Sequence, residues 1–489
     1  MPGGVIALLA SGILSGFLAG CGGGGGQSSQ SNPVVSNTQI DSLTPSMVDA
    51  GSGSFELTVT GADFAQGDVV LWGGSPLTST FVSSTKMTAQ VPASAVASPG
   101  SEVITVTPNP PPPIQFGSAT FTIAIPPLSG NSSYSVSTVN VQANDMAWDP
   151  LSQQIYLSVP GSNGSNNGTI VALDPATVQL GASVSAGGEA NKLAVSSDGS
   201  YLYAGIDSNS SVQRFTLPGL MPDITIPLGS FTAGANSWPL EALDVEVDPQ
   251  NPHTIAVSRG SAEFNNSEQG GIAIYDDAAA RSASVPGEGQ TGSPGPIDAF
   301  TWLPDGSSLY GINSETPDPG YQLFVLSVDS NGVQLAHSYQ SGSFAPQSGL
   351  PIYGDHAPQY DSTTGYLYTD SGYVIDPSTG NQAGSFPLGN LQGGLVADAM
   401  VPDGTLGLAY FLGQTEWGMI GPAAYVLAVY DLTHFNLIGA MVIGSVGTPA
   451  VSPVPARLIR WGANGLAALC GGKVFLISGP FVTSPAPKD

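Results

Sequence analysis

A strand–turn–strand pattern recurs along most of this chain and constrains its fold more than any other feature. The clearest copy, from Asn191 to Leu217, reads NKLAVSSDGSYLYAGIDSNSSVQRFTL. Two short runs of apolar and aromatic residues flank the turn signal at Ser197–Ser200, and a run of alternating character follows. The first strand and its turn can be followed through seven copies, which begin at Met146, Leu193, Val245, Phe300, Pro358, Asp398 and Leu458.

Repetition of strands with a period of about 50 residues predicts a β-propeller. The last copy stops after its third strand, which begins at Lys473, whereas a strand-like segment at Ser133–Val141 precedes the first copy. An unpaired sheet edge invites aggregation, and a propeller has to protect it. We therefore predict an all-β chain in which this N-terminal strand completes the seventh blade. The propeller is expected over residues 133–480, with a tail at 481–489.

The repeat resembles the seven-bladed propellers called YVTN repeats and the related lactonase-type propellers. The matching residues are the D-G turns at Asp198, Asp305 and Asp403, of which the first two precede the strands YLY and SLY. The D-P pairs at Asp174 and Asp376 match as well. The resemblance implies the fold, but it implies no particular activity, since propellers host many unrelated ones.

A different module precedes the repeats, at residues 39–126. Short runs such as FELTVTG from Phe55 alternate apolar and polar residues between Gly/Pro turns, which favours a small β-sandwich. The segment resembles the IPT/TIG family of immunoglobulin-like domains in four places. These are I-x-x-L-x-P from Ile40, G-x-D-F from Gly61, V-x-L-W-G-G from Val69 and F-T-I from Phe121. The resemblance implies a spacer or an accessory binding module.

The N-terminus has the pattern of an export signal. Val5–Leu18 is mostly apolar and too short to span a membrane comfortably, which takes roughly 20 residues. It runs into Leu-Ala-Gly-Cys, which resembles the bacterial lipobox and implies cleavage before Cys21 and lipidation of that cysteine. We expect a signal peptide at 1–20 and a flexible Gly/Ser-rich tether at 21–38. The expected location is the bacterial cell envelope, at the outer membrane or cell surface.

The composition of the chain excludes some classes of binding partner. Nine Lys and Arg against 36 Asp and Glu give a formal charge of −27, which repels a phosphate backbone, so we expect no nucleic-acid binding. The chain has no nucleophile elbow, Walker loop or dinucleotide fingerprint, and we expect no cofactor. With Cys21 lipidated, Cys470 is left unpaired, in an apolar run that predicts burial.

Seven residues at the starts of the repeated inner strands are candidates for a ligand site. Innermost strands surround the centre of a propeller, and aligning the copies on their turns places charged residues there. They are Asp145, Lys192, Asp244, Asp298, His356, Asp398 and Arg457. Such a ring either binds a ligand or is solvated and pairs internally. His356, beside Asp355, is either a general base or a plain loop histidine, and no histidine has a partner at metal-ligand spacing, so we expect no metal site.

Two functions remain open at this stage. The first is a non-enzymatic, lipid-anchored protein whose propeller is a binding platform for protein or glycan at the cell surface. The alternative is a lactonase-like or other hydrolase with its site at the centre of the propeller; a self-assembling surface layer is a third possibility. Long connections at Ser261–Gly270, Asn313–Tyr321 and Gln340–Pro351 are candidate binding loops.

Overall fold

The computed structural model describes most of the chain from Thr38 onward. The described residues are 38–97, 100–107, 117–124, 134–161, 168–233, 235–261, 267–287, 290–312, 322–340, 357–388, 395–415, 424–445 and 457–484. The predicted signal peptide and Cys21 lie outside them, and so does His356. Among the described residues, no helix has the length and apolar character that a membrane span requires.

The N-terminal module is a sandwich of two sheets, as predicted. One sheet has the order β1 (Gln39–Thr44), β3 (Phe55–Ala62), β7 (Lys86–Val91), β6 (Thr78–Ser83). The other has the order β2 (Met47–Asp49), β9 (Ser118–Ala124), β8 (Gly100–Thr107), β4 (Val69–Trp72), β5 (Ser75–Pro76). Alternation along β3 and β7 buries Leu57, Val59 and Met87 in the common core, and a 3₁₀ turn, η1 (Ala93–Val96), follows β7.

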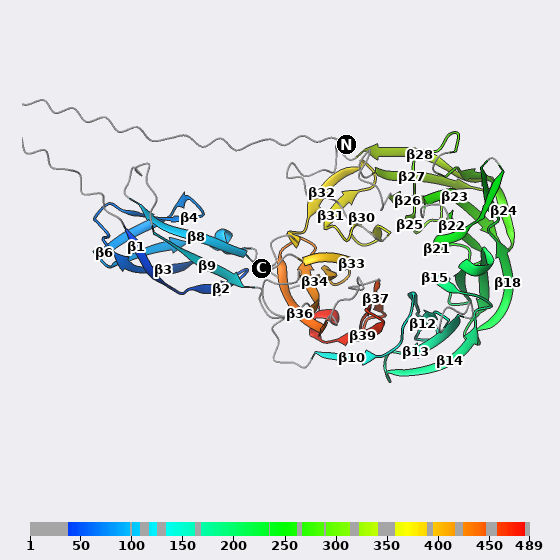
Figure 1. Cartoon of the computed structure of the whole chain (residues 1–489), viewed down its shortest axis with the longest axis horizontal. Coiled ribbons are helices and arrows are strands. Elements are labelled where there is room, and N and C mark those ends of the chain that lie inside the picture. Colours follow the sequence, from blue (N-terminus) through cyan, green and yellow to red (C-terminus); the bar gives the residue numbers. More distant parts are fainter. Residues whose placement is uncertain are drawn as a thin grey trace, which may run out of the picture.

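Apart from one hairpin, the remaining strands form a ring of blades with four strands each (Figure 1). The first three blades are given from the inner to the outer strand. Blade 1 comprises β11 (Asp145–Asp149), β12 (Gln154–Val159), β13 (Thr169–Asp174) and β14 (Gln179–Ser185). Blade 2 comprises β15 (Ala190–Val195), β16 (Tyr201–Ile206), β17 (Ser211–Thr216) and β18 (Met221–Pro227). Blade 3 comprises β21 (Glu241–Val247), β22 (Thr254–Ser261), β23 (Ser267–Asp276) and β24 (Ala279–Val285).

The next three blades repeat this order. Blade 4 comprises β25 (Ala299–Trp302), β26 (Ser308–Ile312), β27 (Gln322–Asp329) and β28 (Gly332–Gln340). Blade 5 comprises β29 (Gln359–Asp361), β30 (Tyr366–Tyr368), β31 (Tyr373–Asp376) and β32 (Asn381–Ser385). Blade 6 comprises β33 (Leu395–Asp403), β34 (Leu408–Thr415), β35 (Ala424–Asp431) and β36 (Leu437–Ser445). The outer strands of blades 3 and 4 also pair with each other, at Ala283 and Gly332, so these two blades share one eight-stranded sheet. Part of one predicted loop, residues 267–270, belongs to β23.

The last blade joins the two ends of the propeller. It contains β37 (Arg457–Trp461), β38 (Gly465–Cys470) and β39 (Lys473–Ser478), and its outer strand is the N-terminal β10 (Ser135–Val139). β10 runs antiparallel to β39, from Ser135 opposite Ser478 to Val139 opposite Val474. This pairing is the ring closure predicted from the sequence. The tail expected from residue 481 begins inside a packed 3₁₀ turn, η6 (Pro480–Val482).

Apolar contacts between blades hold the ring together. Neighbouring side chains on a strand point to opposite faces, so one strand serves two interfaces. On β16, Leu202 packs into the cluster shared with blade 1, whereas Tyr203 packs into the cluster shared with blade 3. A cluster of this kind lies at every blade junction within the described residues, including the junction of blades 7 and 1, where Trp461 meets Met146. Each inner strand touches the next, and β37 touches β11.

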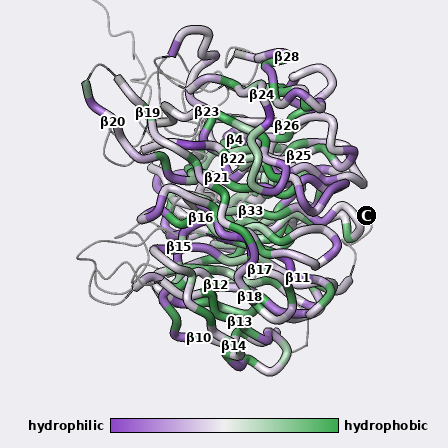
Figure 2. Tube along the Cα trace, turned by 90° about the vertical axis from the view of Figure 1, so that its right-hand side faces the viewer, coloured by the Kyte–Doolittle hydropathy of each residue, from purple (hydrophilic) through white to green (hydrophobic). Residues whose placement is uncertain are grey.

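The two faces of the ring differ in their connections. On one face, each inner strand turns tightly into the second strand, as at residues 303–307 between β25 and β26. The other face, here called the loop face, carries the connections that enter the inner strands and those between second and third strands. One of them, residues 228–240, contains an extra hairpin of β19 (Ser230–Ala233) and β20 (Asn236–Pro239). Figure 2 shows this hairpin standing out from the ring.

Candidate ligand site at the centre of the ring

The structure brings six of the seven candidate residues to the inner strands of six blades. Asp145 is the first residue of β11 and Arg457 the first of β37. Lys192 lies in the first half of β15, Asp244 at the middle of β21, and Asp398 within β33. Asp298 immediately precedes β25. His356, the seventh candidate, lies outside the described residues. Figure 1 shows the inner strands β15, β21, β25, β33 and β37 around the centre of the ring.

Asp145 acts as a clamp between blades 1 and 2. Its Oδ1 accepts a hydrogen bond from the backbone N–H of Met146 at 2.8 Å, and its Oδ2 accepts one from the N–H of Leu193, in the next blade, at 2.9 Å. The carboxylate is almost fully buried and lies 3.5 Å from Nε of Arg457, in blade 7. One side chain therefore connects three consecutive blades.

Asp244 repeats this arrangement between blades 3 and 4. Its two oxygens accept hydrogen bonds from the N–H groups of Val245 and Phe300, both at 3.0 Å. Burial raises the pKa of Asp244, and the nearby Asp145 raises it further, whereas Lys192 and Arg457 act in the opposite direction. The equivalent positions of blades 1 and 3 thus hold the same residue type in the same bonding role.

Asp298 and Asp398 are also nearly buried, with 9% of each exposed. Asp398 lies near the junction of blades 6 and 7, where it contributes to raised pKa values of two neighbours. Burial is the larger cause in both cases: it raises the pKa of Tyr425 to about 12, and it raises the pKa of the buried Cys470 thiol strongly. The predicted burial of Cys470 is thereby confirmed, with 1% of the residue exposed.

Glu246 lies at the centre of the ring but was missed when the seven copies of the repeat were aligned with one another. It lies two positions after Asp244 on β21 and hence on the same side of the strand. Burial raises the pKa of Glu246 to about 8; Asp244 raises it further, Arg457 lowers it, and Asp145 adds a smaller increase. The signal was available, because a strand has a period of two, but the alignment sampled only one position per blade.

Three charged groups at the centre lack hydrogen-bond partners within the described part of the chain. Lys192 Nζ and the Glu246 carboxylate make neither a hydrogen bond nor an ion pair there. Arg457 makes no hydrogen bond, and its ion pair with Asp145 is 3.5 Å long. Lys192 and Glu246 are half-buried and the Arg457 side chain is 25% exposed, so solvent reaches all three.

A further carboxyl group borders this centre on the loop face. Asp207 lies in a 3₁₀ turn, η3 (Asp207–Asn209), between β16 and β17. Its Oδ2 accepts a hydrogen bond from Asn191 Nδ2 at 2.9 Å, while its Oδ1 is shielded from solvent and has no partner. Burial raises the pKa of Asp207 to about 7; Glu241 adds to the increase, whereas Asn191 and Lys192 oppose it.

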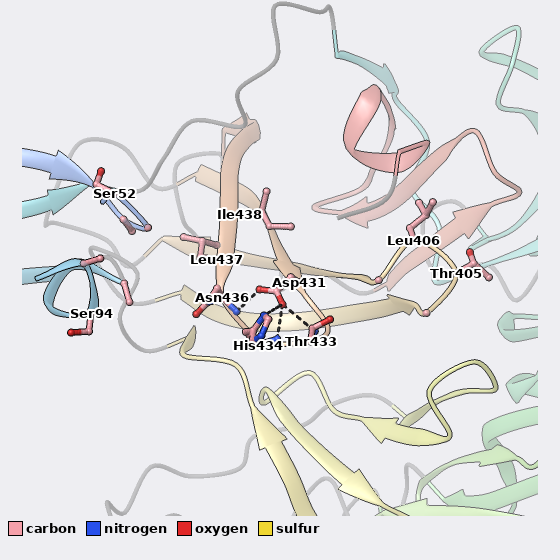
Figure 3. A pocket seen from close by; sticks show the side chains of 16 residues that line it. Ser52, Ser94, Thr405, Leu406, Asp431, Thr433, His434, Asn436, Leu437 and Ile438 are labelled. Carbon is pink, nitrogen blue, oxygen red and sulfur yellow. Dashed lines mark hydrogen bonds and ion pairs between the residues drawn. The ribbon is translucent and has the colours of Figure 1, made fainter. Parts of the chain in front are cut away.

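A separate cleft of about 910 Å³ lies between the sandwich and the turns of blade 6 (Figure 3). The sandwich contributes Ser52 and Ser94, and blade 6 contributes residues around His434. The blade 6 turn is saturated internally: Asp431 accepts hydrogen bonds from the N–H groups of Thr433, His434 and Asn436. This cleft therefore presents few unsatisfied polar groups, and the centre of the ring is the stronger candidate site. No cluster of three or more metal-ligating side chains occurs among the described residues.

Comparison with known proteins identifies the N-terminal sandwich. Residues 38–123 match the family model of the IPT/TIG domain. A search of curated proteins finds no match. The β-propeller domain of Cps50 (Swd1) from Myceliophteria thermophila is 12% identical with a TM-score of 0.48, over 70% of this chain and 99% of that one. Hydrazine synthase from Kuenenia stuttgartiensis is 13% identical with a TM-score of 0.45, over 70% of this chain and 97% of that one. At such identity, a likeness concerns the fold and not the activity. The match assigns the sandwich to the IPT/TIG domain, and the order and pairing of its own strands make the rest of the described chain a β-propeller.

Proposed function

We propose that this protein is a non-enzymatic lipoprotein of the bacterial cell envelope, anchored through lipid on Cys21. Its propeller, of the YVTN or lactonase-like type, serves as a binding platform for a protein or glycan at the cell surface. The IPT/TIG domain is a spacer or accessory binding module. The candidate ligand-binding residues are the charged residues at the centre of the propeller, together with the connections of the loop face around them.

The unequal lengths of the connections on the two faces carry this proposal. Tight turns such as residues 196–200 and 303–307 lie on one face, whereas the longer connection that contains the hairpin β19–β20 enters the inner strand of blade 3 on the loop face. Long connections on a rigid scaffold are where binding surfaces tend to form. The blade junctions and the closed ring supply the rigid scaffold.

The hairpin β19–β20 carries aromatic and hydroxyl side chains on this face. Phe231 and Trp238 pair across its strands with ring centroids 6.0 Å apart. On the other side, hydroxyl groups form a row in which Thr232 bonds to Ser237 and Ser237 to Ser230. A row of hydroxyl groups beside an aromatic pair suits adaptable hydrogen bonding with a protein or glycan surface.

A paired substitution tests the platform. Asn236→Arg places a bulky charge on the exposed hairpin tip, and Ser307→Arg places the same charge on an exposed turn of the opposite face. Binding of the full chain to arrays of envelope glycans and to purified envelope proteins is measured for both variants. We expect the hairpin variant to lose binding and the turn variant to keep it. Equal binding by both variants contradicts a platform on the loop face.

The anchor is tested separately. Expressed in a bacterial host, the full chain should partition into the detergent phase and incorporate a labelled fatty acid, and Cys21→Ala should abolish both. Unchanged partitioning of the variant excludes the anchor and leaves the platform proposal standing.

One observation favours the alternative, a hydrolase. A carboxyl group such as Glu246, with a pKa raised to about 8 beside the acidic Asp244, has the character of a general acid at neutral pH. A lactone or ester substrate screen with wild type and Glu246→Gln examines this. Turnover that disappears in the variant, with a pH limit set by one carboxyl group, supports the hydrolase over the platform.

A further inference from the structure

We propose that the centre of the propeller binds a small zwitterion, a molecule that carries an anionic and a cationic group a few bonds apart, such as a free amino acid. The inference deepens the proposed binding role by naming a ligand class for the central site. It stands on contacts other than those of the loop face, so either proposal can fail alone.

The carboxylates of the clamp residues Asp145 and Asp244 are already occupied and are not available to bind a ligand. Asp145 and Asp244 each use both carboxylate oxygens to accept backbone N–H groups, one within their own blade and one in the next. Their first task is therefore to hold the ring. They still give the centre a negative potential, but their geometry is fixed by the blades.

Three other side chains are left over after this assignment. Lys192 of blade 2, Glu246 of blade 3 and Arg457 of blade 7 have charged ends without hydrogen bonds among the described residues. An ammonium group has three donors, a guanidinium five, and a carboxylate about four acceptor sites. Lys192 and Arg457 both act on Asp244, and Arg457 also acts on Glu246, so groups of both signs lie near one another on separate strands of the ring.

The electrostatic state of these groups fits occupation by an outside molecule. Burial and the two clamp carboxylates disfavour the ionised form of Glu246, which raises its pKa. An ammonium group beside it reverses that effect. Arg457 stays cationic, because Asp145 raises its pKa. The centre therefore presents one carboxylate that gains from a cation and one guanidinium with donors to spare for an anion.

The mixture of signs selects the ligand class. A purely anionic molecule is repelled by Asp145 and Asp244, and also by Glu246 at a pH where Glu246 is ionised, whereas a purely cationic molecule is repelled by Lys192 and Arg457. A molecule with both charges satisfies both sets, and discrimination against single-charge analogues follows from repulsion as much as from attraction. Solvent reaches the three groups, so a small molecule has access to them.

Isothermal titration calorimetry with the full chain tests the proposal. The probes are glycine, β-alanine, 4-aminobutyrate and 6-aminohexanoate, which vary the distance between charges, with butyrate and butylammonium as single-charge analogues. At least one zwitterion should bind at least tenfold more tightly than both analogues. Failure of every zwitterion to do so overturns the proposal.

Charge-removing variants assign the two halves of the site. Glu246→Gln and Arg457→Gln should each weaken binding of the zwitterion at least tenfold. At pH 9, where the Glu246 carboxyl group is ionised, Glu246→Gln should improve binding of butyrate because a repulsive group is gone. Arg457→Gln should improve binding of butylammonium for the same reason. Glu56→Gln and Lys473→Gln, which alter exposed residues elsewhere, are matched controls. Arg457→Lys, which keeps the charge, should retain part of the affinity, and this separates loss of charge from loss of folding.

The pH dependence of zwitterion affinity is a further test, because a purely structural role of Glu246 would not change it. The groups acting on Glu246 are Asp244 on its own strand, Asp145 on β11 and Arg457 on β37. An ammonium group binds the ionised carboxylate, so affinity should rise from pH 6 to pH 8 and binding at pH 7 should release protons. In Glu246→Gln both effects should vanish. A pH dependence that persists in this variant, or zwitterion binding that neither variant weakens, refutes the assignment.

Discussion

Replacing Asp145 with alanine tests whether central carboxylates hold the blades together. The change leaves the buried N–H groups of Met146 and Leu193 without acceptors and removes the ion-pair partner of Arg457. An unsatisfied buried N–H costs about 1–3 kcal/mol, so we expect the free energy of unfolding to fall by about 2–6 kcal/mol. Asp174→Ala is the matched control, because Asp174 also accepts two backbone N–H groups, from Ala176 and Thr177, but at an exposed turn.

Water replaces the lost acceptor at the exposed turn, so Asp174→Ala should cost about 1 kcal/mol or less. Urea unfolding and scanning calorimetry measure both variants, and calorimetry separates the transition of the sandwich from that of the propeller. Only the propeller transition should move. If Asp145→Ala and Asp174→Ala lower stability equally, the clamp interpretation is wrong and the carboxylate at the centre has no special structural role.

Three further predictions follow from other parts of the ring. Deleting the segment Ser135–Val139 removes the strand that pairs with β39, so the propeller should unfold at lower temperature and associate through the freed edge, which size-exclusion chromatography detects. Because folding raises the pKa of Glu246 from 4.5 to about 8, its stabilising contribution is complete below pH 4.5 and is lost as pH rises to 8. Stability of wild type relative to Glu246→Gln should therefore fall by up to about 1.4 kcal/mol per pH unit across that window, as measured by urea unfolding, and a flat difference rejects the shift. The Arg214 side chain is 6% exposed, pairs with Asp223 and Asp277 and stacks on Tyr201. Arg214→Met should therefore lower the free energy of unfolding by about 2–4 kcal/mol, whereas Arg281→Met, at a more exposed ion pair, should lower it by about 1 kcal/mol or less. Equal melting temperatures for the two variants contradict this prediction.

The sequence predicted the architecture because its signals are local and repeated. The D-G and D-P turns mark where strands end, and a segment before the first copy matches the strand missing from the last. The IPT/TIG module was recognised from four short motifs, and residues 38–123 match that family. An alignment error of one or two residues does not affect these predictions, because each concerns a whole strand or a whole turn.

The central site was less accessible to sequence reasoning, because there a shift of one residue turns a side chain to the opposite face. The pairing of β15 with β16 is irregular between Ala190 and Leu193, and that of β21 with β22 between Ala242 and Asp244. Irregularities of this kind decide whether Lys192 and Asp244 face the centre, and periodicity does not reveal them. The network around Arg214 was hidden for another reason: it joins two blades through residues such as Asp277 that are distant in the chain.

The ring of charged residues also shows that equivalent positions need not share a role. Asp145 and Asp244 lie at matching places in blades 1 and 3, and hydrogen bonds commit both of them to the adjacent blade. Lys192 occupies the corresponding region of blade 2 and makes no such bond among the described residues. Repetition builds a scaffold from identical clamps, so a residue that departs from the clamp pattern is free for another task. By that reasoning, the departures at Lys192, Glu246 and Arg457 locate the site better than the carboxylates that the repeat preserves.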